Sequence, residues 1–435
     1  MRAGGRLGGS GCLVVWLLAG CALLSGCAAP RAYLGEPITA TREPQGYRMA
    51  TVLRARGDDD LLFLLSLSGG GMRASTMAYG VLEQLAADSV DRDGHRSRLL
   101  DEVDVISAVS GGAVPAAYYV LYGDRLFEDF TERFLVRDIT ATLSRRILWN
   151  PSGWLRLGSR EYSRGDAYAE FFDRELFHGA TFADLDTRGN RPFLIINSTE
   201  VGLAARFEFT QDNFDGICGD LSRFPIARAV AASSLVPALL TPITVRNYAS
   251  ACDHGESITS TAKSANAWLP WLHLVDGALS DNLGARAMLD ALADGDDHMQ
   301  LRHASTSKPV RRIVYLSVNA GDAKSMWVGQ HRQSPPALQM LRLMGTVPVD
   351  RYTAESKLRL RAALEAEARE LHAELHYIEI EIDSLRAEPE FAALVELPTS
   401  FDLQPDAMRA LHRASRRLLA QSPEYQRLLE AFREP

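Results

Sequence analysis

Short apolar runs bounded by glycine recur along the chain and indicate β-strands. Continuous runs of this kind are typical of strands that are buried on both faces of a parallel sheet. Five runs fit this description: residues 61–65, 103–106, 193–196, 272–275 and 313–318. Residues 377–382 instead alternate hydrophobic and acidic side chains. That alternation predicts an edge strand with one face in water.

Helical periodicity fills the intervals between these runs. Residues Ala74, Ala78, Val81, Leu82 and Leu85 recur at spacings of three and four, which places one apolar stripe on a helix. Residues 354–372 are rich in Ala, Leu, Glu and Arg, which are strong helix formers. Strands that alternate with helices predict an α/β fold, with a mostly parallel central sheet and helices on both faces.

The pattern predicts one large domain rather than several. We expect it to span residues 58–435, with a helical C-terminal part and an inserted cap at about residues 144–185. A Ser- and Thr-rich stretch at 250–267 predicts an exposed loop. Composition agrees with a large buried core, because 46% of the 435 residues are hydrophobic and 23% are charged.

The first 26 residues have the character of a targeting segment. Arg2 and Arg6 precede an apolar run at 12–24, which is the length of a secretory signal and too short to span a bilayer. Leu24-Ser25-Gly26-Cys27 resembles a bacterial lipobox, in which the chain is cut before a cysteine that is then acylated. A box ending at Cys21 would leave a shorter apolar core, and an uncleaved anchor is the other alternative. Residues 27–57 are predicted to be a tether.

Charge affects the expected partners. Loss of residues 1–26 removes two arginines and no acid, so the net charge changes from −8 to −10. An acidic body does not favour nucleic acid and attracts anionic headgroups weakly. Acyl chains on Cys27 would therefore hold the protein at the membrane. Ala28, rather than Asp, follows this cysteine, which by resemblance suggests the outer membrane of a Gram-negative envelope.

Two cysteines remain after Cys12, Cys21 and Cys27 are assigned to the signal and the anchor. Export would place Cys218 and Cys252 where disulfides persist, so they form a candidate pair. Two unpaired thiols are the alternative. No His or basic residue accompanies either one in a motif, so neither is a candidate nucleophile.

A strand-to-helix elbow surrounds Ser110. The run at 103–106 continues through Ala108 to Ser110, which Gly111 and Gly112 follow. Small residues on either side are needed where a strand and a helix approach closely, and such an elbow holds a nucleophilic Ser in a strained turn. The usual form is G-x-S-x-G, with Ala108 here in place of the first Gly. An ordinary turn without catalysis is the alternative.

A glycine loop, Ser68-Gly69-Gly70-Gly71-Met72-Arg73-Ala74, follows the first strand. Consecutive glycines allow several amides to point one way, as an oxyanion hole requires. The loop also satisfies the dinucleotide pattern G-x-G-x-x-[GA]. That pattern needs an acid at the end of the next strand, which instead ends at Ser110, with Asp104 at its start. The hydrolase interpretation is therefore preferred.

Asp276 follows the apolar run at 272–275, and Gly277 and Ala278 turn the chain away. A carboxylate at a strand end is placed to accept a proton from Ser110. A solvated turn Asp is the alternative. His273 would face the opposite side of its strand, and no histidines have metal-ligand spacing with a further ligand. The sequence thus predicts a Ser–Asp site without metal or cofactor.

Together these motifs resemble the patatin-like phospholipase family, which has a glycine oxyanion loop, a G-x-S-x-G elbow and a D-G-[GA] turn in this order. Residues 232–242 also resemble the family's A-S-x-x-x-P-x-x-F-x-P segment, with Leu240 in place of the aromatic residue. Asp281-Asn282 after the aspartate turn and Leu397-Pro398-Thr399-Ser400-Phe401 near the end also resemble family segments. Ala108, Ser68 and Ala74 depart from the usual residues, which bears on turnover more than on fold.

The resemblance implies roles for individual residues. Ser110 would attack an ester carbonyl, Asp276 would activate it, and the amides of Gly69, Gly70 and Gly71 would hold the oxyanion. Arg73 would orient the loop or meet a phosphate. The expected activity is lipid acyl-ester hydrolysis of the phospholipase A or lysophospholipase kind, with a membrane lipid as substrate. Lipid acyl transfer, and non-catalytic binding of lipid or a partner on the same fold, are the alternatives.

Overall fold

The computed structural model describes residues 33–38, 46–56, 60–92, 94–139, 141–142, 162–186, 191–235, 241–250, 269–292, 309–321, 332, 334–386, 390–395, 397, 399–401 and 403–433. All structural statements below concern these residues. None of their helices has the length and the apolar character that crossing a bilayer requires.

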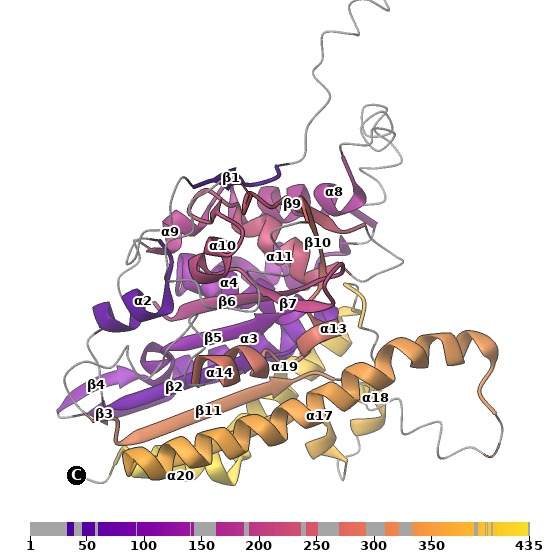
Figure 1. The fold of residues 1–435 in the computed structure, drawn as a ribbon. Helices are drawn as coiled ribbons and strands as arrows, with labels where there is room; N and C mark the ends of the chain where they lie inside the picture. Colours follow the sequence, from indigo (N-terminus) through magenta and orange to yellow (C-terminus); the bar gives the residue numbers. More distant parts are fainter. Residues whose placement is uncertain are drawn as a thin grey trace, which may run out of the picture.

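An eight-stranded sheet forms the centre of the fold (Figure 1). Its path runs β12 (Glu374–Glu381), β11 (Arg312–Asn319), β2 (Leu61–Leu67), β5 (Val105–Val109), β6 (Phe193–Glu200), β10 (Trp271–Asp276) and β9 (Ile243–Arg246), and β7 (Ala205–Glu208) pairs with β6. Neighbours from β12 to β6 are all parallel. The predicted mostly parallel sheet is confirmed.

β10 corrects one prediction, because it is antiparallel to both of its neighbours, β6 and β9. The run at 272–275 was expected among the parallel strands, and that expectation is wrong. An apolar run reports burial, whereas strand direction depends on how the chain returns to the sheet. Here Trp271 and His273 are exposed and only the last three residues are buried without interruption. This end of β10 lies beside Ser198 and Thr199 of β6.

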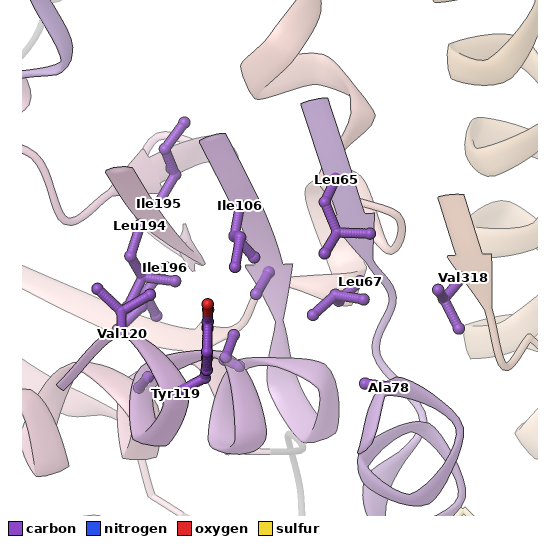
Figure 2. Close-up of a cluster of buried hydrophobic side chains, with 14 of the residues drawn as sticks. Leu65, Leu67, Ala78, Ile106, Tyr119, Val120, Leu194, Ile195, Ile196 and Val318 are labelled. Carbon is purple, nitrogen blue, oxygen red and sulfur yellow. The ribbon is translucent and has the colours of Figure 1, made fainter. Parts of the chain in front are cut away.

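Helices cover both faces of the sheet, as predicted. In Figure 1, α14 (Ala285–Leu292) and α17 (Ala337–Leu371) lie in front of the strands, and α3 (Gly71–Ala87) and α19 (Pro405–Gln421) lie behind them. Figure 2 shows part of the core, where Ala78 of α3 and Tyr119 of α4 (Ala113–Tyr122) approach Leu67 and Ile106 of the strands. These side chains belong to one continuous buried cluster.

Two predicted elements are longer or more buried than their patterns indicated. α3 carries the expected apolar stripe, yet Ser75 and Thr76 on its other sides are buried as well, because both η2 and α19 pack against this helix. The helix predicted at 354–372 is the second half of α17, which begins at Ala337. β12 alternates buried and partly exposed residues at the edge of the sheet, so the predicted edge strand is confirmed.

Part of the predicted tether, residues 27–57, packs on the domain. β1 (Glu36–Pro37) pairs with β8 (Gly219–Asp220), and α2 (Met49–Arg56) follows the buried residues Tyr47 and Arg48. The Arg48 guanidinium forms ion pairs with Asp212 and Asp215. A sequence without periodicity was interpreted as a spacer, but a two-residue strand pairing and a single buried Arg side chain hold this segment, and no periodic pattern reveals either.

The predicted cap at about 144–185 lies partly outside the described residues, which resume at Tyr162. Its described part forms α8 (Arg164–Phe172), η4 (Asp173–Phe177) and α9 (Phe182–Asp186), and α8 packs against α11 (Ile226–Ser234). The remaining elements are β3 (Ser89–Arg92), β4 (His95–Arg98), η1 (Leu99–Glu102), η2 (Ser110–Gly112), α5 (Arg125–Phe130), η3 (Thr131–Leu135), α10 (Gln211–Asp215), α13 (Ala278–Asp281), η5 (Ile382–Leu385), α18 (Phe391–Val395) and α20 (Pro423–Ala431).

Candidate active site

Ser110 occupies a strained turn between β5 and η2. Val109 is extended, with φ at −130°, and Ser110 then takes a φ of 51°, in the left-handed region. A residue with a Cβ in this region costs about 1–2 kcal/mol, and such strain concentrates at functional sites. The side chain is buried. This geometry is the elbow that the small residues around Ser110 predicted.

The two glycines after Ser110 allow other backbones to approach. A Cβ on Gly111 would lie 2.0 Å from the carbonyl oxygen of Gly71, and one on Gly112 would lie 2.6 Å from that of Ser68. Either contact would push the glycine loop away from the elbow. Ala108 lies earlier, inside β5, where its methyl group joins the buried core. The family's first glycine is therefore replaced at an ordinary buried strand position, where an alanine methyl group fits.

Asp276 meets Ser110 although 166 positions separate them in the chain. Ser110 Oγ donates to Asp276 Oδ2 at 2.9 Å, and the Ala278 N–H donates to Asp276 Oδ1, also at 2.9 Å. The meeting depends on β6, which pairs Asn197 with Val109 of β5 and Ser198 with Asp276. Since β10 runs the opposite way, its last residue arrives at the level where β5 ends.

Gly277 makes the aspartate turn possible. A Cβ there would lie 2.3 Å from the Asn197 carbonyl oxygen and 3.1 Å from Val109 Cγ1. Any side chain would therefore separate the turn from β5 and β6. Glycine keeps Asp276 within reach of Ser110.

Burial raises the pKa of Asp276 to about 6. The hydrogen bonds from the Ala278 N–H and the Ser110 hydroxyl favour the carboxylate and offset only part of this effect. A carboxylate with such a pKa is ionised at neutral pH and is more basic than an exposed aspartate. These are the properties that a general base needs.

The glycine loop leaves two amides open beside the elbow. Gly69 N–H donates to Asn282 O, and Met72 N–H donates to Ser400 O. The N–H groups of Gly70 and Gly71 have no acceptor within the described part of the chain. Both residues have positive φ, at 138° and 58°. The expectation that Gly69 donates to an oxyanion is therefore corrected, because its amide is occupied, and the open donors are Gly70 and Gly71.

Arg73 holds the loop from behind. Its side chain is fully buried and donates to Ala320 O and Leu397 O. Of the two roles considered for it, orientation of the loop agrees with these contacts. The guanidinium joins the start of α3 to the end of β11 and to the segment near residue 400.

Ser233 links the elbow to the aspartate turn, a connection that the sequence did not reveal. Its Oγ accepts the Ser110 N–H at 2.7 Å and donates to Asn197 O at 2.5 Å. Its carbonyl accepts the Gly277 N–H, and the carbonyl of Leu235 accepts the Asp276 N–H. The available signal was the A-S segment at 232–242, which carried a resemblance but no role.

Tyr168 and Asn282 also lie near the pair without having been predicted there. The Tyr168 hydroxyl is buried and has no hydrogen-bond partner among the described residues. Its pKa is raised by burial and by the charge of Asp276. Asn282 Oδ1 would lie 2.6 Å from a Cβ on Gly69. Neither residue has a local pattern that points to Ser110.

The other predicted sites lie away from Ser110 and Asp276 or outside the described residues. Cys218 is buried and disulfide-bonded, while Cys252 and Cys27 fall outside the described residues, so their assignments stay predictions. His273 is exposed and bonds with Thr244. No cluster of three or more His, Cys, Asp or Glu side chains arranged for a metal occurs in the described ranges.

Comparison with known proteins places this geometry in a family. The sequence profile described as patatin-like phospholipase matches residues 65–289, just over half of the 435-residue chain. A search of curated proteins finds no match. Among solved structures, human GIVD cytosolic phospholipase A2 aligns with a TM-score of 0.49 at 13% identity, covering 94% of this chain and 69% of that one.

VipD from Legionella pneumophila aligns with a TM-score of 0.33 at 12% identity, covering 95% of this chain and 73% of that one. The profile match is the decisive comparison, since it spans the glycine loop, Ser110 and Asp276. The chain belongs to the patatin-like phospholipase family, a membership that supports lipid hydrolysis as its general activity.

Proposed function

We propose that this protein hydrolyses acyl esters of lipids, in the manner of a phospholipase A or lysophospholipase, with Ser110 as nucleophile and Asp276 as general base. The observation that carries the proposal is the 2.9 Å hydrogen bond from Ser110 Oγ to Asp276 Oδ2. It lies in a strained, buried elbow beside two open amides. A nucleophile, a base and oxyanion donors are the parts that acyl transfer requires.

The first half-reaction would form an acyl-enzyme. Asp276 takes the hydroxyl proton while Ser110 Oγ bonds to the ester carbonyl carbon, and the carbonyl oxygen becomes an oxyanion. The N–H groups of Gly70 and Gly71 stabilise this charge, with each such donor worth about 3–4 kcal/mol in comparable sites. The carbon–oxygen bond to the leaving alcohol then breaks, and Asp276 returns its proton to that alcohol.

The second half-reaction would release the fatty acid. Asp276 removes a proton from water, whose oxygen attacks the acyl-Ser110 carbonyl carbon through a second oxyanion. The bond to Ser110 Oγ breaks, and the proton held by Asp276 restores the hydroxyl. No described histidine contacts either residue, so one carboxylate would handle the proton in both halves.

The direct test compares wild type with Ser110→Ala on a phospholipid and on a short-chain ester. We expect Ser110→Ala to lower kcat/KM at least about a thousandfold, because the nucleophile is lost. Ser317→Ala is the matched control, since Ser317 is also buried in the sheet but its hydroxyl has no partner among the described residues. Equal activity of wild type and Ser110→Ala would remove the proposal.

Two further measurements separate the rival activities. Product analysis with an added alcohol acceptor distinguishes hydrolysis from acyl transfer, because transfer places the acyl group on that acceptor. A fluorophosphonate probe reports whether Ser110 is nucleophilic in the folded protein. A protein that never takes up the label at Ser110 would be a binding protein rather than an enzyme.

We also propose that the chain is exported and acylated at Cys27, which would hold it in the outer membrane. The lipobox-like Leu24-Ser25-Gly26-Cys27 and the apolar run at 12–24 that precedes it support this. Cells fed a labelled lipoprotein precursor should incorporate label into wild type and not into Cys27→Ser. Label in both would contradict acylation at this residue.

A further inference from the structure

The first half of α17 exposes a row of apolar side chains. Met340, Met344 and Val347 are 47%, 72% and 50% exposed, and Leu343 beside them is partly exposed. Spacings of three and four residues place all four on one side of the helix. We call these four residues the α17 stripe.

The α17 stripe lies outside the buried core that the described residues form. Among the described side chains of α17, the first buried one is Thr353. Figure 1 shows this half of α17 projecting from the body of the molecule. Its 14 residues before Arg351 correspond to roughly 20 Å of helix, at about 1.5 Å per residue.

The projecting half lies on the side of the sheet that carries the candidate active site. β12 follows α17 and is parallel to β11, so α17 runs back along the sheet and begins at the carboxyl edge. Contacts agree with this, because Asp350 and Thr353 line a cavity of about 470 Å³ together with Asn319 and Asn282. Asn282 is the residue that contacts the glycine loop beside Ser110.

Charge distinguishes this segment from the rest of the chain. Between Asp322 and Asp350 the sequence contains no acidic residue, and it contains Lys324, Arg332 and Arg342. The whole chain has a net charge of −8. The stripe therefore lies in a locally basic stretch of an acidic protein.

We propose that the α17 stripe inserts into the surface of a lipid bilayer containing anionic lipids. A helix with exposed apolar side chains and basic neighbours lies in the interfacial plane, with its apolar face about 5–10 Å into the headgroup boundary. Basic residues nearby add attraction to anionic headgroups. Docking in this way would present the carboxyl edge of the sheet to the membrane. This surface is distinct from the Ser110 site and from the proposed anchor at Cys27.

The experiment measures vesicle binding of the full chain carrying Cys27→Ser, so that no acyl group contributes. Vesicles contain equal parts of phosphatidylcholine and phosphatidylglycerol, and binding is read by co-sedimentation. We expect the double variant Met344→Glu and Val347→Glu to bind at least about tenfold more weakly, because two inserting side chains are lost. The uncharged pair Met344→Gln and Val347→Thr should also weaken binding.

Val136→Glu is the matched control, since Val136 is 44% exposed and lies directly after η3, away from α17 in the sequence. It should bind like the parent chain. Unchanged binding of both double variants, or an equal loss in Val136→Glu, would overturn the inference. The inference would also be overturned if the stripe joined two copies of the chain. In that case the parent chain would be a dimer, and the double variants would dissociate it while vesicle binding persisted.

Binding is measured without hydrolysis, so this inference and the proposed activity fail separately. Ser110→Ala should bind vesicles like the parent chain and lack activity. The stripe variants should keep their activity on a short-chain soluble ester, which needs no membrane.

Discussion

Asp276 combines two properties that ordinary surface aspartates lack, burial and a hydroxyl partner. Burial raises its pKa to about 6, and the Ser110 hydroxyl is its hydrogen-bond donor. The protonated form cannot accept a proton from Ser110. The proposed reaction thus depends on how much Asp276 is ionised.

Activity should therefore rise with pH through an inflection near pH 6. The carboxylate is the active form, so kcat/KM on a soluble ester should increase about tenfold per pH unit below this value and level off above it. A pH–rate profile of wild type measures it. A profile that stays flat through this range would separate Asp276 from proton transfer.

Asp276 should also lower the stability of the fold at neutral pH. Its pKa is about 6 in the folded state and 3.8 unperturbed, so the folded state binds the proton more tightly. The contribution of Asp276 to the free energy of unfolding is fully present below about pH 4. It is lost as the pH rises through about 6, and the loss amounts to about 3 kcal/mol. Asp276→Asn should raise the unfolding temperature relative to wild type at pH 8.

The difference between the two proteins should shrink toward pH 4, where Asp276 is protonated. Thermal unfolding of both proteins at several pH values measures this. A constant difference at all pH values would mean that ionisation of Asp276 has no effect on stability.

At the scale of elements, α11 keeps the elbow and the aspartate turn together. Ser233 at its end accepts the Ser110 N–H, and its carbonyl accepts the Gly277 N–H. The nucleophile and the base thus lie on two strands, β5 and β10, that are joined by β6 between them and by α11 beside them.

Ser233→Ala should leave the buried Ser110 N–H without an acceptor. We expect a loss of about 1–3 kcal/mol in stability and a decrease in kcat with little change in KM, because Ser233 positions Ser110 and does not touch substrate. Ser234→Ala is the control, since the Ser234 hydroxyl donates to Val230 O within the same helix and bonds to neither strand in the described part of the chain. Equal kcat values for the two variants would exclude a positioning role.

At the scale of the whole molecule, the segment before the first sheet strand is part of the domain. Arg48 is buried against Asp212 and Asp215, and Tyr47 Oη accepts a hydrogen bond from the Leu194 N–H of β6 at 2.7 Å. The tether that the sequence predicted at residues 27–57 would therefore end well before residue 57.

Arg48→Ala should destabilise the protein by about 3–5 kcal/mol, because the buried Asp215 and the partly buried Asp212 both lose the guanidinium as a partner. Arg223→Ala is the control: its ion pair with Glu36 is exposed and should contribute less than about 1 kcal/mol. Denaturant unfolding measures both. Similar values for the two variants would mean that the segment around Arg48 does not contribute to the stability of the domain.

Sequence patterns were sufficient to predict a feature where its physical cause acts between residues that are close together in the chain. Apolar runs identified the strands, because a buried strand needs apolar residues on both faces. The small residues around Ser110 identified the elbow, because only small residues allow β5 and the glycine loop to approach. Three glycines identified the loop, although its pattern did not show that Asn282 occupies the Gly69 amide.

By itself, the sequence determined the strands, the helices that cover them and the separate motifs around Ser110, the glycine loop and Asp276. The tertiary structure alone decided that β10 is antiparallel, that Asp276 lies 2.9 Å from Ser110, and that Ser233 and Tyr168 lie beside them. The physical reason is that periodicity and turn chemistry act between neighbours in the chain. Strand direction, burial and pKa depend on residues that only folding brings together.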